Sequence, residues 1–427
     1  MKSTDRCFAL MAAVFFIFLV LILVVFGHTP TNDTEAYIQY AEVCLQNGDL
    51  YPSAHLFKGE PFIWHPGPIN MIVLSLGWFQ SVVPLLLLYC LMKAISAFYI
   101  AKITNLFFSE RTALVAMLLF MLYPNNWGAS TTLLSETPMV CLMLLSLFMV
   151  LSRNGWWLML TAGAVMAVAN WFRPIAGIFL LALFIWFVLL QRSNIVKKWL
   201  PMMVGYGMIV VLIGSSVYLR TGHFIYQSQS FWYNMADDCY DGATPDAHFG
   251  RPLFEKGTPR YIENREKLTC FECNEIWKQR CSDWLKDHKT DYLKKLPWRF
   301  YYMYQNDIDN MTAFLSDKHH AEDNFVTLPL RHILDEWRHL SAVQWLALLS
   351  TVFYFSLMLL AAVGVCLLIR KRKWDFLLLA LLIIGGGTLA TILLVQGETR
   401  FKAPYMPFIF MLASITLNSN KLESHSN

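Results

Sequence analysis

The chain has 427 residues, of which 56% are hydrophobic, 15% aromatic and only 15% charged. Soluble domains carry about 25% charged residues, so the composition excludes an ordinary soluble protein and indicates a chain that crosses a membrane several times. The formal net charge of +4 is small, and the basic residues gather in short loops, which excludes a nucleic-acid-binding face.

The first apolar stretch, Phe8–Phe26, follows Lys2 and Arg6 and has no small-residue cleavage site after it. It is therefore expected to be a retained signal anchor. The segment that follows, 27–67, is acidic and rich in tyrosine. Thr31 or Asn32 is suited to cap a helix that begins here.

Apolar stretches near 20 residues can cross a bilayer core of roughly 30 Å. Gly67–Phe79 is shorter and is expected to lie at the membrane interface. Arg173-Pro174 interrupts a long apolar run and predicts a hairpin, because proline ends the preceding helix. We expect an all-α polytopic membrane protein with about ten transmembrane helices, at about 8–26, 82–108, 112–127, 131–151, 156–172, 174–190, 199–219, 343–369, 376–395 and 403–418.

Basic residues in the short loops 109–111, 152–153, 191–198 and 370–375 fix the expected orientation. The positive-inside rule places these loops and both termini in the cytoplasm. The acidic loop 27–67, the Arg173 hairpin and "QGETRFK" at 396–402 then lie outside.

The chain divides into an N-terminal transmembrane module at 1–219, an external insert at 220–341 and C-terminal transmembrane helices with a short cytoplasmic tail at 342–427. The middle of the insert has the apolar spacing of amphipathic helices. Its first part, rich in Asp, Gly and Pro, is expected to form loops. The insert is therefore predicted to be a soluble piece of mixed or mainly helical structure.

Five motifs in order resemble those of one family: "NDTEAYIQYAEVCLQNGDLYP", "HPGPINMIVLSLGWF", "YPNNWGASTTLLSETPMVCLMLLSLFMVL", "NWFRPIAGIFLLALF" and "GETRFKAPYMPFIFMLASI". The sequence is similar to the GT-C superfamily of polytopic glycosyltransferases, in the branch of protein O-mannosyltransferases, lipid A aminoarabinose transferases and lipopolysaccharide-core transferases. The resemblance covers 1–219 and 343–418.

The resemblance implies that Asp33 is the catalytic base and that the donor is a polyprenyl-phosphate sugar. Composition alone favours a simpler interpretation, in which Asp33 is a solvated acid at a helix start. The family often has Asp-Glu adjacent, whereas Thr34 separates Asp33 from Glu35 here, so Glu35 is assigned only to the substrate side of the site. No acid partner is required, because polyprenyl phosphate leaves already ionised, and a single displacement inverts the anomeric centre.

The leaving phosphate requires cations. Arg400 and Lys402 follow Glu398 in a short external turn, and Arg173 lies at another external hairpin. Arginine binds phosphate bidentately, whereas lysine offers a point charge. Snorkelling at the interface is the alternative for all three cations.

Three further residues are candidate substrate contacts. Glu136 lies near the outer end of a predicted span, where acids usually have a partner or a task; a structural hydrogen bond is the alternative. His65 is suited to touch substrate or a metal, although a histidine beside proline and tryptophan more often packs. Tyr37 is expected on the same helix face as Asp33, with its ring available to stack on a sugar.

Two other patterns are set aside. Asp307-Ile308-Asp309 resembles the Asp-x-Asp of nucleotide-sugar transferases, but no glycine-rich loop accompanies it. Cys270-x-x-Cys273, with Cys239 and Cys281, has the composition of a zinc site, but an external insert favours disulfides of unassigned pairing. No cofactor is certain, and participation of a divalent metal stays open.

We therefore expect an inverting glycosyltransferase in the bacterial plasma (inner) membrane, active on its external, periplasmic face. It would move a sugar from a polyprenyl-phosphate donor to a lipid, glycan or protein acceptor. Membrane lipids are further expected partners, and nucleic acid is not. A transporter is the main alternative, but it should show two related halves with charges at mid-membrane. A non-enzymatic envelope-glycan assembly protein is the third, and it would tolerate loss of Asp33.

Overall fold

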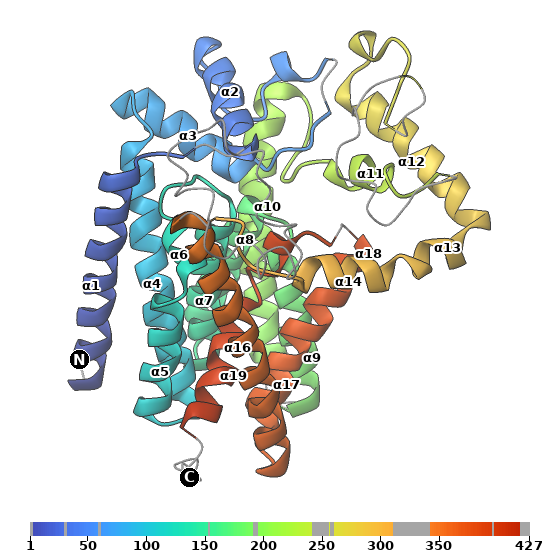
Figure 1. Cartoon of the computed structure of the whole chain (residues 1–427). Helices are drawn as coiled ribbons and strands as arrows, with labels where there is room; N and C mark the ends of the chain where they lie inside the picture. The colour runs from blue at the N-terminus through green and yellow to red at the C-terminus, as the bar shows by residue number, and fades with distance from the viewer. Residues whose placement is uncertain are drawn as a thin grey trace.

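The computed structural model describes residues 3–29, 32–58, 61–152, 154–190, 195–240, 256, 260–310, 342–394 and 397–418. These residues form helices, and the β structure among them is one isolated antiparallel bridge between Lys58 and Thr269. Figure 1 shows most of the helices running side by side in one bundle, with a smaller group projecting from it. The prediction of an all-helical chain is confirmed for the described residues.

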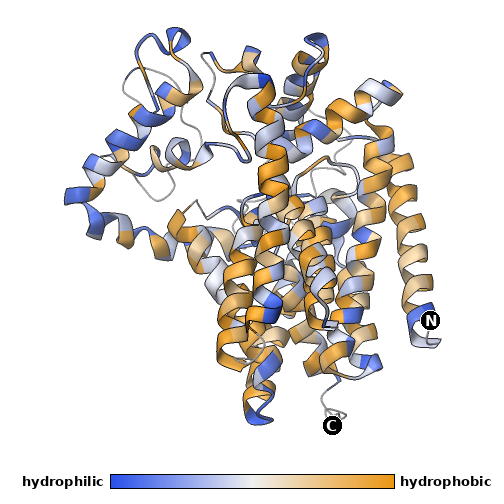
Figure 2. Cartoon of the chain, turned by 180° about the vertical axis from the view of Figure 1, so that it is seen from behind, coloured by the Kyte–Doolittle hydropathy of each residue, from blue (hydrophilic) through white to orange (hydrophobic). Residues whose placement is uncertain are grey.

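Every one of the ten predicted spans contains a helix. Five helical segments are long and apolar enough to cross a membrane: α1 (Ser3–Phe26), α4 (Val83–Phe107), α10 (Ile195–Thr221), most of α16 (Ala342–Arg370), and the segment Trp374–Leu394. The others are shorter: α5 (Glu110–Met121), α7 (Glu136–Ser152), α8 (Trp156–Phe172), α9 (Ala176–Leu190) and α19 (Met406–Leu417). The helices of the bundle consist largely of hydrophobic residues (Figure 2).

Some boundaries differ from the expected ones for local reasons. The predicted span 112–127 ends early, because Pro124 starts a new short helix, α6 (Pro124–Gly128). The segment Trp374–Leu394 consists of α17 (Trp374–Leu381), a π-helical turn η8 (Leu382–Gly386) and α18 (Gly387–Leu394). At the predicted hairpin, Arg173 is extended between α8 and α9, as expected for a residue before proline.

Helices α8 and α10 pack closely through glycine. A Cβ atom added at Gly163 would collide with the backbone of Met202, and one added at Gly205 would collide with the backbone of Leu160. Small residues allow helix backbones to approach each other in membranes, where water does not drive helices together. This contact fixes the helix that leads into Arg173.

One end of the bundle carries α2 (Asn32–Gln46), η1 (Ala54–Leu56), α3 (Pro66–Phe79), α11 (Ser230–Met235), η3 (Arg265–Lys267) and α12 (Cys270–Asp287). We call it the loop end. Helix α1 begins at the opposite end, where α16 also turns into α17 (Figure 1). Helices α2 and α3 thus lie at the same end of the molecule as α11 and α12 of the insert (Figure 1).

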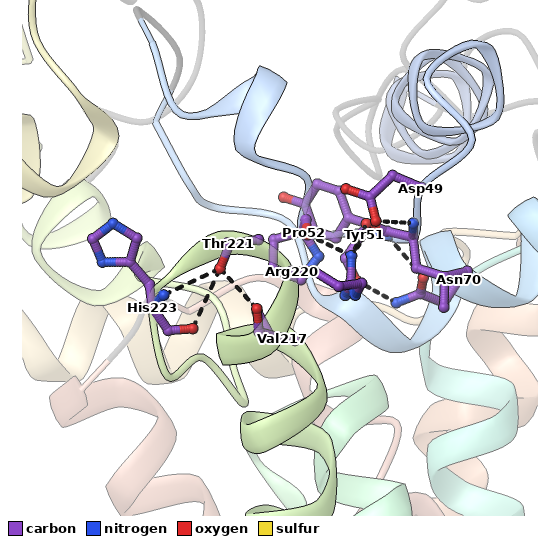
Figure 3. Close-up of polar contacts among 9 residues, drawn as sticks. Asp49, Tyr51, Pro52, Asn70, Val217, Arg220, Thr221 and His223 are labelled. Carbon is purple, nitrogen blue, oxygen red and sulfur yellow. Dashed lines mark hydrogen bonds and ion pairs between the residues drawn. The ribbon is translucent and has the colours of Figure 1, made fainter.

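The acidic segment is fixed to the bundle by two side chains, as Figure 3 shows. Arg220, at the end of α10, forms an ion pair with Asp49 and donates to the Leu50 carbonyl at 2.8 Å. Asn70 of α3 accepts from the Tyr51 N–H at 2.9 Å and donates to the Tyr51 carbonyl at 2.6 Å. These bonds satisfy the polar backbone of a loop that would otherwise be free to move.

The insert is attached to the membrane helices through α13 (Lys289–Lys294) and α14 (Leu296–Tyr304). Arg299 is 1% exposed and forms an ion pair with the equally buried Asp238 at 2.5 Å. It also donates to the carbonyl of Ile392 in α18 at 2.7 Å. Helix α12 begins with a capping box between Thr269 and Glu272, which explains where it starts.

Candidate active site

Asp33 lies in the first turn of α2, at the loop end of the bundle. The unsatisfied N–H groups of a first helical turn favour a negative charge, so this position stabilises the carboxylate. The side chain is 19% exposed, which leaves it accessible to a substrate. Glu35, two residues on, is exposed.

Arg400 is carried by η9 (Thr399–Lys402), a short turn just before α19. Its guanidinium forms an ion pair with Asp33, which is 367 positions earlier in the chain, and a second one with Glu398 at 2.9 Å. Burial opposes ionisation of this side chain, but Glu398 and Asp33 raise the pKa of Arg400 well above its usual value. The arginine is therefore a permanent positive charge in contact with the predicted base.

Arg173 forms a second ion pair, with Glu136 at the start of α7, and both side chains are buried. Ser135 supports the pair: its Oγ accepts from Arg173 at 3.3 Å and donates to Glu136 at 3.2 Å. The guanidinium of Arg173 stands 4.7 Å from the ring centre of Phe401, and that of Arg400 stands 5.8 Å from the same ring. Both arginines of the site thus lie close to the Phe401 ring.

Tyr37 and His65 complete the wall beside these charges. Tyr37 is buried and packs edge-on against Trp64, with ring centres 5.4 Å apart. Burial, together with the nearby charges of Asp33 and Glu136, raises the pKa of Tyr37, so the phenol stays protonated. Burial, with Arg173 adding to it, lowers the pKa of His65 to about 3, and its Nδ1 lies 3.1 Å from Ser228 Oγ. His65 is therefore neutral at physiological pH.

Lys402 lies in the same turn as Arg400 but is completely buried. Its Nζ lies 3.1 Å from Asp307 Oδ1 and donates to the carbonyls of Asn306 at 2.5 Å and Thr399 at 2.7 Å. An ammonium group has three hydrogens to donate, and these three protein oxygens account for all of them. The residue ties the η9 turn to the loop at 305–310.

A cavity of about 60 Å³ adjoins the Arg400 and Glu136 side chains. Its other walls come from α4, α5, α6, α7, α19 and the loop at 305–310 of the insert. The polar residues that line it are Lys93, Asn125, Asn126, Glu136, Asp307, Asp309, Asn310 and Arg400.

The structure thus brings together Asp33, Arg400, Glu398, Glu136 and Arg173, with Tyr37 and His65 beside them. Sequence reasoning did not identify Lys93, although a lysine inside a predicted span is a recognised signal of function. It set Asp307 and Asp309 aside, because no glycine-rich loop accompanies them; the ion pair of Asp307 with the distant Lys402 left no signal in the sequence. Within the described ranges, no three His, Cys, Asp or Glu side chains are arranged to hold a metal ion.

Comparison with known proteins supports the earlier resemblance. Residues 69–218 match the family described as dolichyl-phosphate-mannose-protein mannosyltransferase. A crystal structure of the apo oligosaccharyltransferase from Archaeoglobus fulgidus is similar over 98% of this chain, with 13% identity and a TM-score of 0.52. The chain spans about half, 51%, of that protein's length. A search of curated proteins gives no significant match.

These findings confirm the resemblance to the GT-C superfamily, and they agree with the apolar helices of a membrane protein. The family match covers α4 to α9 together with most of α3 and α10. The structural similarity extends over nearly the whole chain and concerns the fold.

Proposed function

We propose that this chain, a membrane glycosyltransferase of the GT-C superfamily, transfers a sugar from a polyprenyl-phosphate donor to an acceptor hydroxyl with inversion at the anomeric carbon. One observation carries the proposal: Asp33 and Arg400, expected separately to be the base and the phosphate-binding cation, are in direct contact. The family match, described for an enzyme that uses dolichyl-phosphate mannose, supports a lipid phosphate as the carrier.

Asp33 acts as the general base in this mechanism. It takes the proton of the acceptor hydroxyl while the acceptor oxygen forms a bond to the anomeric carbon. The bond between that carbon and the phosphate oxygen breaks, and the electron pair leaves with the polyprenyl phosphate. One displacement inverts the centre, so no second carboxylate about 5 Å away is needed as a nucleophile.

Arg400 binds the leaving phosphate. In the structure its donors are engaged by Asp33 and Glu398. An incoming phosphate competes for the guanidinium, which offers two parallel hydrogen bonds to phosphate oxygens. Binding of the donor then frees the Asp33 carboxylate to accept the proton of the acceptor hydroxyl. The base becomes available only when the leaving group is in place.

The other expected contacts take supporting roles. Arg173 is neutralised by its ion pair with Glu136 and supports the structure of the site beside Phe401. Lys402 holds the turn that carries Arg400 instead of binding phosphate itself, because its donors are already used. Glu398 orients Arg400, neutral His65 and protonated Tyr37 are hydrogen-bonding groups beside the donor, and exposed Glu35 faces the acceptor.

The active end of the molecule is the loop end, which we place on the external, periplasmic face of a bacterial plasma membrane. The basic turn between α16 and α17 lies at the opposite end (Figure 1), and positive charge is retained on the cytoplasmic side. The acceptor is then a lipid, a glycan or a protein that reaches this face.

Mass spectrometry of surface lipids, glycans and proteins tests the function. Cells with and without the gene should differ by the mass of one sugar on one class of molecule. The wild-type gene should restore that mass, and an Asp33→Asn gene expressed at the same level should not. Identical profiles, or restoration by the Asp33→Asn gene, would argue against the enzyme and for a non-enzymatic assembly role.

A further inference from the structure

The cavity beside Arg400 has one polar and one apolar wall. The apolar side includes Phe120, Tyr123 and Phe410, whose rings pack edge-on with centres 5.4–5.6 Å apart. The polar side includes Lys93 and the loop residues Asp309 and Asn310, together with Arg400 and Glu136. At about 60 Å³, the space admits roughly four water-sized groups.

The loop that carries Asn310 is held tightly. The Asn310 N–H donates to the Asn125 side chain at 2.9 Å, and a Cβ atom added at Gly128 would collide with the Asn310 carbonyl. Yet the buried Oδ1 of Asn310 accepts no hydrogen bond from any residue that the structure describes. A rigid acceptor in a cavity wall is suited to a ligand that donates a hydrogen bond.

Charge limits the kind of ligand. Among the described residues Lys93 forms no ion pair; its Nζ donates to the Asn126 side chain at 3.0 Å and lies 5.7 Å from the ring centre of Phe120. Asp307 and Asp309 face the same space. Carboxylates would repel a phosphate, and a lysine would repel a cationic group, so the mixture favours a neutral ligand with many hydroxyl groups.

We propose that this cavity receives one hydroxyl-bearing edge of the transferred sugar, that the sugar is a neutral monosaccharide, and that Asp309 and Asn310 select it. A pyranose ring has an apolar C–H face and a hydroxyl edge, which match the aromatic wall and the polar wall. A phosphate on Arg400 would place the sugar attached to it beside this cavity. The inference rests on the proposed function, since it takes the sugar to arrive on a lipid phosphate.

Asp309 receives a hydrogen bond from Thr399, in the turn that carries Arg400. Replacing Asp309 could therefore disturb Arg400 as well as the cavity. Thr399→Val removes the same hydrogen bond without changing a cavity residue, and it is the matched control. Ala403, which ends the η9 turn, also lines the cavity. Ala403→Leu narrows the cavity from that side and removes no side-chain hydrogen bond, which gives a second, independent variant.

The experiment measures binding of the full-length protein in nanodiscs to undecaprenyl phosphate and to the same lipid carrying glucose, galactose, mannose or xylose. Wild type should bind at least one sugar-linked lipid about tenfold more tightly than undecaprenyl phosphate itself. Asn310→Ala and Asp309→Asn should each reduce that advantage by about five- to tenfold, the cost of one lost hydrogen bond. Ala403→Leu should do the same, whereas Thr399→Val should keep it.

Binding of sugar-free undecaprenyl phosphate separates this inference from the proposed function. The three cavity variants should bind it within twofold of wild type, and Arg400→Ala should not. The sugar site would be overturned if the cavity variants bound both lipids equally more weakly, or if they kept the wild-type preference for the sugar-linked lipid. It would also be overturned if Thr399→Val lost that preference as Asp309→Asn does. Wild-type transfer from a sugar-linked lipid would still support the proposed function in each of these cases.

Discussion

Replacing Lys402 by methionine distinguishes a structural lysine from one that binds phosphate. The buried Nζ contacts Asp307 and the carbonyls of Asn306 and Thr399 at 2.5–3.1 Å. Methionine keeps most of the side-chain volume but leaves Asp307 buried with Tyr123 as its remaining donor. Removing one partner of a buried ion pair costs about 3–5 kcal/mol, and we expect a loss of this order for Lys402→Met.

The assay is thermal unfolding of the purified protein in detergent, together with the KM for the lipid donor. Lys402→Met should unfold at a lower temperature. The double variant Lys402→Met/Asp307→Asn should recover part of the loss, because it no longer buries an unpaired carboxylate. A Lys402→Met protein with wild-type stability and a KM raised at least tenfold would refute this reasoning and return Lys402 to the phosphate site.

Three further predictions concern the loop end. Burial would raise the pKa of Asp49, but hydrogen bonds from Leu50 and Arg220 outweigh it and lower that pKa. The ionised Asp49 therefore stabilises the fold fully above the ordinary Asp pKa of about 4. This stabilisation is lost as the pH falls through the lowered pKa of the folded protein. The difference in unfolding temperature between wild type and Arg220→Gln should shrink over that acid range, and a difference independent of pH would contradict it. Cys239 and Cys281 are buried thiols of one hydrophobic cluster. In an external insert we expect them to form a disulfide, so in protein unfolded before labelling both should resist alkylation until reduced; free alkylation of both would exclude that disulfide. A reporter fused near residue 260 should report an external location, and cytoplasmic behaviour would reverse the proposed orientation.

Hydrophobic length and local signals predicted the helices well. Pro174 located the hairpin after α8, and the length of the apolar stretch Gly67–Phe79 indicated the short helix α3. The weaker predictions involve segments with mixed local signals, such as the region around Pro124, where one expected helix became α5 and α6.

Contacts between distant segments were beyond local reasoning. The pairing of Asp33 with Arg400 joins α2 to η9 across most of the chain, and only the family resemblance suggested that both belong to one site. The roles of Lys402 and Asp307 depend on burial, which a sequence pattern does not report for a charged residue in a loop. That substrate contacts Glu35, Tyr37, His65 and Glu398 stays a prediction.

The most direct test of Asp33 as the general base is single-turnover transfer by Asp33→Asn with saturating polyprenyl-phosphate sugar. Asparagine keeps the shape of the side chain but cannot accept the acceptor's proton, and loss of a positioned base costs about 10²–10⁴-fold in rate. We predict a loss of that size, with donor binding retained because Arg400 is still in place. A near-normal transfer rate by Asp33→Asn would contradict the assignment of Asp33 as the base.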